Sequence, residues 1–415
     1  MKLIKPFKGL RPTPELASRV ASHPYDVVSR KEAAEQAVDN PLSFFHINKP
    51  EVDLPDAVSP FDDLVYETGS KNLNRFIENG ILEQDPEDTF YLYKQIMGEH
   101  EQIGLVAVAS IDAYEEGLIK KHELTRPQKE DDRVNHMKAL GAQVGPVFLT
   151  YRADEKIDQI VNEEIANTPE YDFVAVDNTR HIFWKIEDRV VISALEEAFL
   201  KVDSLYVADG HHRSAAASRV RDAYSEANPE HKGDENYNWF LVVVFPDRQM
   251  QILDYNRVVK DLNGLECATF IDQVGERFEL RKLETSECKK PDREHQFSLY
   301  IDGQWFMATA KGSFINQSDP VKNLDVSILQ EQLLEPILGI SDPRRDERLD
   351  FIGGIRGVEE LERRVDSGEW ALAIALYPTS ISSLMAIADA NEVMPPKSTW
   401  FEPKLKSGLI VHLLN

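Results

Sequence analysis

The sequence predicts a mixed α/β protein with a larger core over residues 1–250 and a second, β-rich lobe over residues 251–415. Two observations predict this organisation. Up to residue 245, short apolar runs typical of strands alternate with longer segments of helical periodicity, as in an α/β core. Beyond residue 250 the segments become shorter and more charged, and the alternating runs 296–301 and 304–309 flank Asp302-Gly303, a typical hairpin turn.

The length and composition of the chain make some classes of function less favourable than others. With 415 residues, the chain is long enough for two or three domains. Its 72 acidic and 47 basic residues give a net charge of -25, which disfavours binding to nucleic acid or to an anionic membrane surface. The two cysteines, Cys267 and Cys288, form no metal-binding spacing, and no apolar signal segment or membrane-spanning run is present. We expect a cytoplasmic protein with a small-molecule substrate, compatible with a homodimer.

Local signals define the elements of the first third of the chain. Ser29 with Glu32 three residues on is a capping box, which predicts a helix through Val38. The segment His23-Pro24-Tyr25-Asp26 has little helical periodicity, so we expect a turn that holds these side chains together. Periodicity predicts the other elements: a strand and turn at 3–12, a strand at 43–47, a helix at 66–79, and a hairpin of strands 90–97 and 102–109.

The next third alternates helices and strands. Thr125 with Gln128 resembles a capping box and predicts the start of a helix that Gly141 ends. The remaining elements expected here are a strand at 144–151, a helix at 155–166, paired strands at 171–176 and 181–186 around Asp177-Asn178, a helix at 192–199, and a strongly apolar strand at 238–245.

The C-terminal lobe has weaker functional signals. Helices are expected at 324–338, 358–367 and 380–390, and a buried strand at 370–377. The glycine-rich run 353–357 lacks the spacing of a known phosphate-binding motif. The segment 394–404 combines prolines, aromatic residues and lysines. It is compatible with a lid that packs on the body, or with one that closes over a nucleotide or acidic substrate through Lys397.

The stretch from Leu205 to Val220 carries the strongest functional signal. A strand ends at Asp209-Gly210, and an Ala-rich helix follows. Gly210 permits a sharp turn and a close approach to a ligand, and the helix start offers amide groups to a phosphate. Two imidazoles and a guanidinium follow directly, at His211, His212 and Arg213. Because this exceeds what a helix cap needs, the stretch indicates a phosphate-binding site.

A second dense stretch begins at His122 and Glu123. Four cationic side chains of the helix that follows fall on one face: Arg126, Lys129, Arg133 and His136. This face could bind an anion, or it could be a solvated face that pairs with acidic neighbours. The spacing leaves both interpretations open.

Five separated motifs resemble the family known as domain of unknown function 1015. In chain order they are Ile4–Pro12, Ser22–Ser29, Lys120–Glu123, Asp209–Arg213 and Met394–Lys404. The Asp-Gly-His-His-Arg motif is similar to the nucleotide-phosphate motif of the ParB/sulfiredoxin-like fold, which includes free-serine kinases. The resemblance implies a ParB/sulfiredoxin-like nucleotide-binding core. It also implies a phosphotransferase that uses ATP or ADP with Mg²⁺ to phosphorylate a small hydroxylated metabolite, with free L-serine as one candidate.

Under this interpretation the motif residues receive roles. Asp209 would bind Mg²⁺ or accept the substrate proton, and Glu123 beside His122 is the second candidate base. The residues expected to bind the nucleotide are Gly210, His211, His212, Arg213, Lys129 and Arg133. Those expected to complete the substrate pocket are Arg11, His23, Tyr25, Asp26 and Lys397.

Two other functions remain open at this stage. The first is a non-catalytic regulator that senses a nucleotide, since ParB-like proteins use the motif as a CTP or ATP switch. The second is a hydrolase or another transferase in which His211 and His212 act as acid and base or as metal ligands.

Overall fold

A computed structural model describes all 415 residues, and the chain divides into two compact units. Unit 1 comprises Met1–Met250 and Pro403–Asn415, and unit 2 comprises Gln251–Glu402. The sequence-based division, which assigned all of 251–415 to the second lobe, needs correction at the C-terminus. The apolar stretch Leu409–Val411 is buried, and Leu10 exchanges backbone hydrogen bonds with Val411, so the chain end belongs to unit 1.

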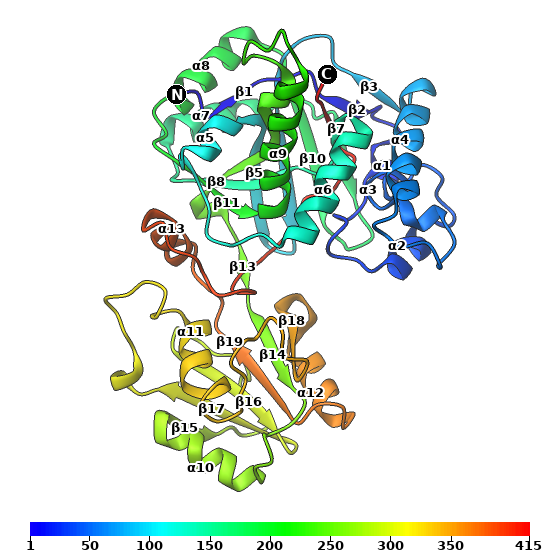
Figure 1. Cartoon of the computed structure of the whole chain (residues 1–415). Helices are drawn as coiled ribbons and strands as arrows, with labels where there is room; N and C mark the ends of the chain where they lie inside the picture. The colour runs from blue at the N-terminus through cyan, green and yellow to red at the C-terminus, as the bar shows by residue number, and fades with distance from the viewer. The chain divides into compact units, whose positions relative to one another are not determined.

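Unit 1 is built on a mixed nine-stranded sheet with the order β6-β11-β8-β12-β5-β4-β10-β9, with β1 paired to β5 (Figure 1). The strands are β1 (Ile4–Lys5), β4 (Phe90–Met97), β5 (His100–Ser110), β6 (Ile119–Lys120), β8 (Val147–Tyr151), β9 (Tyr171–Val174), β10 (Arg180–Ile186), β11 (Leu205–Asp209) and β12 (Trp239–Pro246). The central strands β5 and β12 are almost wholly buried, which explains their continuous apolar runs.

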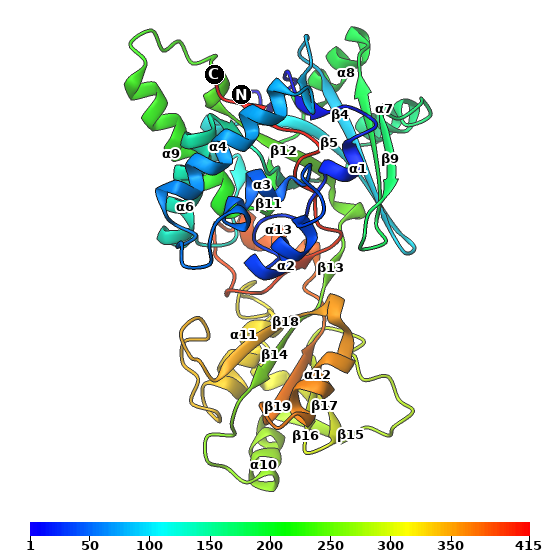
Figure 2. The same cartoon turned by 90° about the vertical axis from the view of Figure 1, so that its right-hand side faces the viewer.

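Two long helices pack against each other in front of this sheet: α6 (Pro127–Leu140) and α9 (His211–Ala227) (Figure 1). A group formed by α2, α3 and α4 lies beside α6 (Figure 2). The other helices of unit 1 are α1 (Ala17–Val20), α2 (Arg30–Ala37), α3 (Phe45–Asn48), α4 (Asp63–Glu78), α5 (Ile111–Glu115), α7 (Glu155–Glu164) and α8 (Arg189–Phe199). Its short strand pairs are β2 (Leu10–Pro12) with β3 (Leu82–Gln84), and β7 (Ala142–Gln143) with β21 (His412–Leu413).

Unit 2 contains a six-stranded antiparallel sheet with the order β15-β17-β16-β19-β14-β18. The strands are β14 (Tyr255–Val259), β15 (Phe278–Lys282), β16 (Gln296–Ile301), β17 (Gln304–Ala310), β18 (Leu349–Gly353) and β19 (Leu372–Leu376), and a short pair joins β13 (Ile252–Leu253) to β20 (Trp400–Phe401). Its helices are α10 (Cys267–Arg277), α11 (Asp325–Leu329), α12 (Gly357–Asp366) and α13 (Ile381–Asp389). The predicted hairpin turn is present, with positive φ at Asp302 and Gly303.

Several local predictions are confirmed, and they rest on short-range rules. The Ser29–Glu32 capping box is present at the start of α2, and Gly141 ends α6 in the left-handed conformation. Strands β4 and β5 form the predicted hairpin. The turn at His23–Asp26 is also present.

Three local predictions are wrong. Instead of a strand at 43–47, the chain forms the short helix α3 (Phe45–Asn48), because so short an apolar run fits both periodicities. Helix α6 begins at Pro127 without a side-chain cap, and the hydroxyl of Thr125 donates to Glu130 instead. The helix expected over 324–338 divides into α11 and a π-helical turn at Gln330–Leu334.

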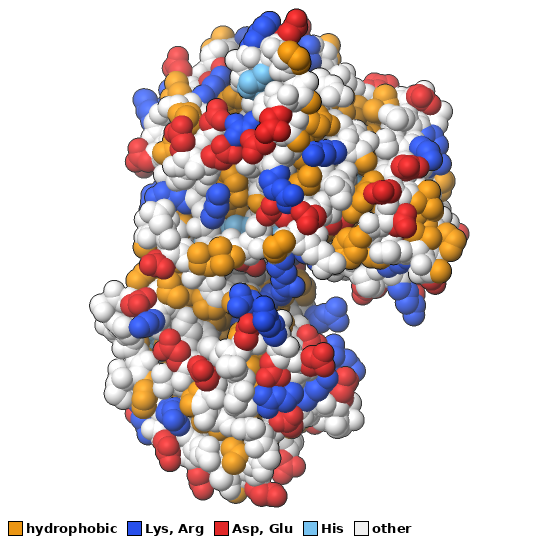
Figure 3. Space-filling model, in the orientation of Figure 1, with side chains coloured by type: hydrophobic (Ala, Val, Ile, Leu, Met, Phe, Trp, Pro, Cys, Tyr) orange, Lys and Arg blue, Asp and Glu red, His pale blue; other side chains and the backbone are white.

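Acidic and basic side chains are interspersed over the face of unit 1 that Figure 3 shows. Acidic side chains on this face are therefore spread over the surface rather than gathered in one patch. None of the helices combines the length and the apolar composition that a membrane crossing requires.

Candidate functional site

The junction between β11 and α9 is the centre of the candidate site. Asp209 ends the strand, Gly210 turns the chain with a φ of 105°, and α9 begins at His211. Such a φ is readily accessible only to glycine. No side chain caps the start of α9. Its first amides therefore lack the usual side-chain acceptor, as in helix termini that bind anions.

Asp209 is a recessed carboxylate between two cations. Its Oδ2 accepts a hydrogen bond from Lys404 Nζ at 3.3 Å, and its Oδ1 lies 3.8 Å from Arg213 Nη2. Burial alone would raise the pKa of Asp209, but Lys404 and Arg213 outweigh burial and hold this pKa well below its ordinary range. Asp209 is therefore ionised at neutral pH.

Arg213 is buried, although it carries a charge. Its Nη1 donates to the carbonyl of Pro146, and its guanidinium packs against the turn, where a Cβ on Gly210 would lie 3.2 Å from Arg213 Cζ. The Nε of Arg213 has no hydrogen-bond partner. Because buried polar atoms are nearly always paired, this N–H is a donor that a ligand or a water molecule can use.

His122 and His211 form an edge-to-face pair with their ring centroids 4.4 Å apart. Burial lowers the pKa of His122 to about 4 and also holds the pKa of His211 well below its ordinary value. Glu123 Oε2 lies 3.9 Å from His211 Nδ1. Both rings are neutral at pH 7, so they supply no positive charge to a phosphate. That charge comes from Arg213 and Lys404.

His212 joins the two long helices. Its Nε2 accepts a hydrogen bond of 3.0 Å from the backbone N–H of Arg126, at the start of α6. Burial lowers the pKa of His212, and the charges of Asp26, Arg126 and Lys129 also act on it. The motif thus brings the His23–Asp26 turn, α6 and α9 together.

The cationic side chains of α6 do not form one solvated face. Arg133 is buried, donates to Asp132 Oδ2 from both Nε and Nη2, and lies with its Cζ 3.7 Å from the ring centre of Tyr25. His136 is also buried, with its Nε2 2.9 Å from the carbonyl oxygen of Ile47. Arg126 and Lys129 are exposed. The face therefore divides into two buried members and two exposed ones.

Two pockets lie between α6 and the His23–Asp26 turn. The smaller, of about 20 Å³, has room for one water molecule. It is lined by Pro24, Tyr25, Asn48, Arg133, His136, Met137, Val144, Gly145, Arg213 and Ser407. The larger, of about 230 Å³, shares Tyr25, Asn48, Arg133 and His136 with it and is also lined by Lys129 and Asp132. Its volume suits a small metabolite.

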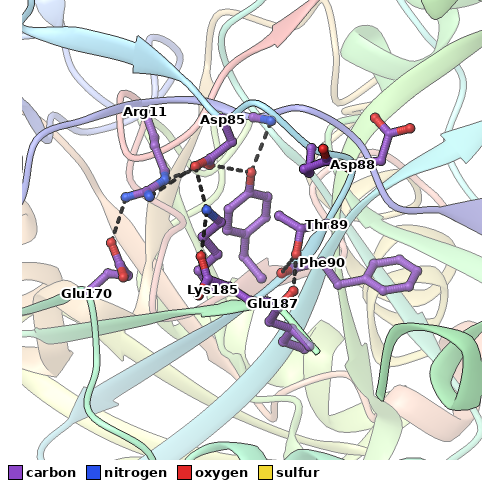
Figure 4. Close-up of polar contacts among 12 residues, drawn as sticks. Arg11, Asp85, Asp88, Thr89, Phe90, Glu170, Lys185 and Glu187 are labelled. Atoms are coloured by element: carbon purple, nitrogen blue, oxygen red, sulfur yellow. Dashed lines mark hydrogen bonds and ion pairs between the residues drawn. The ribbon is translucent and has the colours of Figure 1, made fainter. Parts of the chain in front are cut away.

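Arg11, expected in the substrate pocket, belongs to a different cluster (Figure 4). Its Nε donates to Asp85 at 2.7 Å, and its Nη1 donates to Glu170 at 2.9 Å and to the hydroxyl of Tyr171 at 3.2 Å. None of these partners contacts Asp209, His211 or Arg213. Arg11 therefore lies in a cluster whose carboxylates already neutralise its charge.

Two other substrate candidates, His23 and Lys397, also have neighbours of their own. His23 Nε2 lies 3.6 Å from Asp177 Oδ2 and beside Lys406. Lys397 belongs to unit 2, where its Nζ lies 5.5 Å from the ring centre of Tyr255. Tyr25 is the substrate candidate that lines both pockets, and Asp26 is exposed near His212.

Sequence reasoning missed Lys404, the side chain that contacts Asp209. It selected Lys397 from the same segment, because that lysine stands next to Ser398 and Thr399. A signal for Lys404 was available: Lys404 and Lys406 flank Leu405 just before an apolar run. A lysine within a buried segment requires a counter-charge, so Lys404 and Lys406 would each be expected to have an acidic partner.

The fold and the site define a mixed α/β protein whose strand–glycine–helix junction is suited to binding an anion. The chain belongs to the family described as "Protein of unknown function (DUF1015)", whose profile matches residues 4–327. The resemblance expected from the motifs is thereby confirmed. The match includes the first four motifs and ends before Met394–Lys404.

Solved structures with a similar chain trace are distant. A conserved hypothetical protein from Pyrococcus furiosus has 13% identity and a TM-score of 0.34, covering 73% of this chain and 95% of that one. A free serine kinase in complex with AMP has 14% identity and a TM-score of 0.36, covering 73% and 92%. SbnI from Staphylococcus aureus, truncated at its C-terminus, has 11% identity and a TM-score of 0.37, covering 73% and 85%. No protein of curated function matches the sequence.

Proposed function

We propose that this protein is a nucleotide-dependent phosphotransferase whose acceptor is a small hydroxylated metabolite, with free L-serine as one candidate. The β11–α9 junction is the observation that carries the proposal. It combines an uncapped helix start, an ionised Asp209 and the two cations of Arg213 and Lys404. Phosphoryl transfer depends mainly on positioning and on charge neutralisation, and this junction supplies groups for both.

In this proposal the first turn of α9 and Arg213 bind the phosphates of ATP or ADP. The unpaired Nε of Arg213 is a donor for a phosphate oxygen. No group of three or more His, Cys, Asp or Glu side chains is arranged to hold a metal ion by itself. A single carboxylate at Asp209 instead fits Mg²⁺ that also binds the phosphates and neutralises their charge.

The low pKa of Asp209 favours a metal-binding role over a basic one, because an efficient general base has a pKa near the working pH. Glu123 is then the better candidate for proton acceptance, next to the neutral ring of His211. The larger pocket, lined by Tyr25, Lys129 and Arg133, is the proposed acceptor site. The exposed Lys129 would bind an acidic group of the acceptor, since Arg133 is already paired with Asp132.

The test is a combined thermal-shift and turnover screen of the purified protein with Mg²⁺. ATP, ADP and CTP would be added alone and with L-serine, related amino acids or sugars. Arg213→Gln is the site variant, and Arg219→Gln is its matched control, since Arg219 lies on the same helix but pairs with Glu130 and Asp131 on the surface.

We expect a nucleotide to stabilise the wild type and the control, and phosphorylated acceptor to form with both but not with Arg213→Gln. Stabilisation by a nucleotide without any phosphorylated product would favour the nucleotide-sensing regulator. A wild type that responds to no nucleotide would contradict both functions, and would leave His122 and His211 as a proton-transfer pair for hydrolysis.

A further inference from the structure

The segment Pro403–Ser407 carries two lysines into the interior of unit 1, and each meets an aspartate. Lys404 Nζ donates to Asp209 at 3.3 Å, and its side chain is 14% exposed. Lys406 Nζ donates to Asp177 at 2.6 Å, and its side chain is 3% exposed. The two pairs differ in tightness and burial, although they lie two residues apart.

The backbone of this segment is held firmly. Gln95 Nε2 donates to the carbonyl of Lys404 at 2.9 Å, and the backbone N–H of Lys406 donates to the hydroxyl of Tyr93 at 3.4 Å. Ser407 exchanges two backbone hydrogen bonds with Ser22. Lys404 is therefore delivered to Asp209 by a fixed main chain, and only its flexible side chain can move.

We propose that Lys404 is a phosphate-binding residue of the nucleotide site, an inference that rests on the proposed function. In the free protein its ammonium group neutralises Asp209. When a nucleoside di- or triphosphate binds with Mg²⁺, Asp209 would hold the ion and the Lys404 ammonium group would be released from the carboxylate. The ammonium group then turns to a phosphate oxygen, as the long stem of lysine permits.

Lys404 contacts Asp209 less closely than Lys406 contacts Asp177, at 3.3 Å against 2.6 Å, and Lys406 also has His23 beside it. The exchange makes the site selective. Mg²⁺ alone must displace a lysine, whereas Mg²⁺ with a nucleotide supplies that lysine with a new partner.

The experiment compares wild type, Lys404→Met, Lys404→Arg and the matched control Lys406→Met, each titrated with Mg·ATP and Mg·ADP by calorimetry and by thermal shift. Loss of a charge-assisted hydrogen bond should weaken nucleotide binding about 10- to 100-fold in Lys404→Met. Lys404→Arg should retain part of the affinity because it keeps the charge. Lys406→Met should lower the Tm of the free protein and leave the Kd for nucleotide unchanged.

The outcomes separate this inference from the proposed function. If wild type and Lys404→Met bind nucleotide with the same Kd, Lys404 has only a structural role and the phosphotransferase proposal stands. If the wild type binds neither nucleotide, the proposed function fails and the inference with it. Titration with Mg²⁺ alone is a second readout: Mg²⁺ should raise the Tm of Lys404→Met but not that of the wild type. A Tm increase in the wild type would overturn the exchange.

Discussion

Two clusters in unit 1 each place an aspartate between an arginine and a lysine, yet they differ in how completely their charges are satisfied. Asp85 accepts hydrogen bonds from Arg11 at 2.7 and 3.1 Å and from the hydroxyl of Tyr91 at 2.7 Å, with Lys185 at 2.9 Å (Figure 4). Asp209 has Lys404 at 3.3 Å and Arg213 at 3.8 Å.

The difference shows how a structural charge cluster can be told from a functional one. Around Asp85 the donors fill the carboxylate, so a ligand would have nothing to add. Around Asp209 the contacts are longer, and the buried Nε of Arg213 is unpaired. Unsatisfied buried groups are costly unless a partner arrives, so the looser cluster is the one suited to a ligand.

The largest expected effect is a loss of activity on substitution in the Asp209 cluster. Asp209→Asn should reduce phosphate transfer about 1000-fold or more, because the variant loses the carboxylate proposed to bind Mg²⁺. Initial rates with saturating nucleotide and acceptor measure this. Asp172→Asn, at an exposed ion pair with Arg180, is the control and should keep full activity. An Asp209→Asn protein with wild-type rates would remove Asp209 from the mechanism.

The next largest effect is a loss of stability on substitution in the Asp85 cluster. Arg11→Met should destabilise the protein by about 3–5 kcal/mol, since it leaves the buried Asp85 and its neighbours without their main counter-charge. Denaturant unfolding followed by circular dichroism measures the change. The folded fraction should bind nucleotide as the wild type does. A loss of nucleotide affinity without a loss of stability would instead assign Arg11 to the site.

A smaller effect is expected at the turn itself. Gly210→Ala should cost about 1–2 kcal/mol of stability, because a φ of 105° is unfavourable for a residue with a Cβ. The new Cβ would also press on Arg213, which lies 3.2 Å away. Weaker nucleotide binding should therefore accompany the lower Tm. Gly312→Ala, where the new Cβ meets open space at ordinary φ, is the control and should change neither.

The last effect is a pH dependence of stability to which the looser cluster contributes. The pKa of His122 is about 4 in the folded protein and about 6.5 when unfolded, so the unfolded chain binds the proton first. Stability should fall as the pH falls from 6.5 toward 4. The pKa of Asp85 is also lowered, after Arg11, Tyr91 and Lys185 overcome burial, but an aspartate loses its contribution only below its ordinary pKa.

His122→Phe should therefore flatten the stability profile between pH 6.5 and pH 4. The flattening should be partial, since burial also lowers the pKa of other histidines: His136, His181 and His412. Urea unfolding at a series of pH values measures the slope. An unchanged slope in His122→Phe would mean that this ring is not buried in the neutral form.

The parts of the fold that follow short-range rules could be predicted from the sequence. The Asp209-Gly210 turn, the Ser29–Glu32 capping box and the hairpin of β4 and β5 each depend on residues close together in the chain. The junction between β11 and α9 could be predicted for the same reason, because its strand, glycine and helix follow one another directly in the sequence.

The partners of the charged residues could not be predicted in this way. Arg11 pairs with Glu170, and Asp209 pairs with Lys404, across 159 and 195 positions of the chain. A sequence shows that a charge is present but not which distant charge neutralises it. The protonation state of His122 and His211 could not be predicted either, since it is burial in the complete fold that makes these rings neutral.

The return of Pro403–Asn415 to unit 1 has a consequence for how the protein is made. A ribosome that has released residues 1–250 has already produced Asp209, Arg213 and the strands around them. It has not yet produced Lys404, or the strand β21 that pairs with β7. All of unit 2 must be translated before these pieces exist. A chain still in synthesis therefore holds Asp209 with Arg213 but without Lys404, and the site reaches its resting state only after residue 404 has emerged.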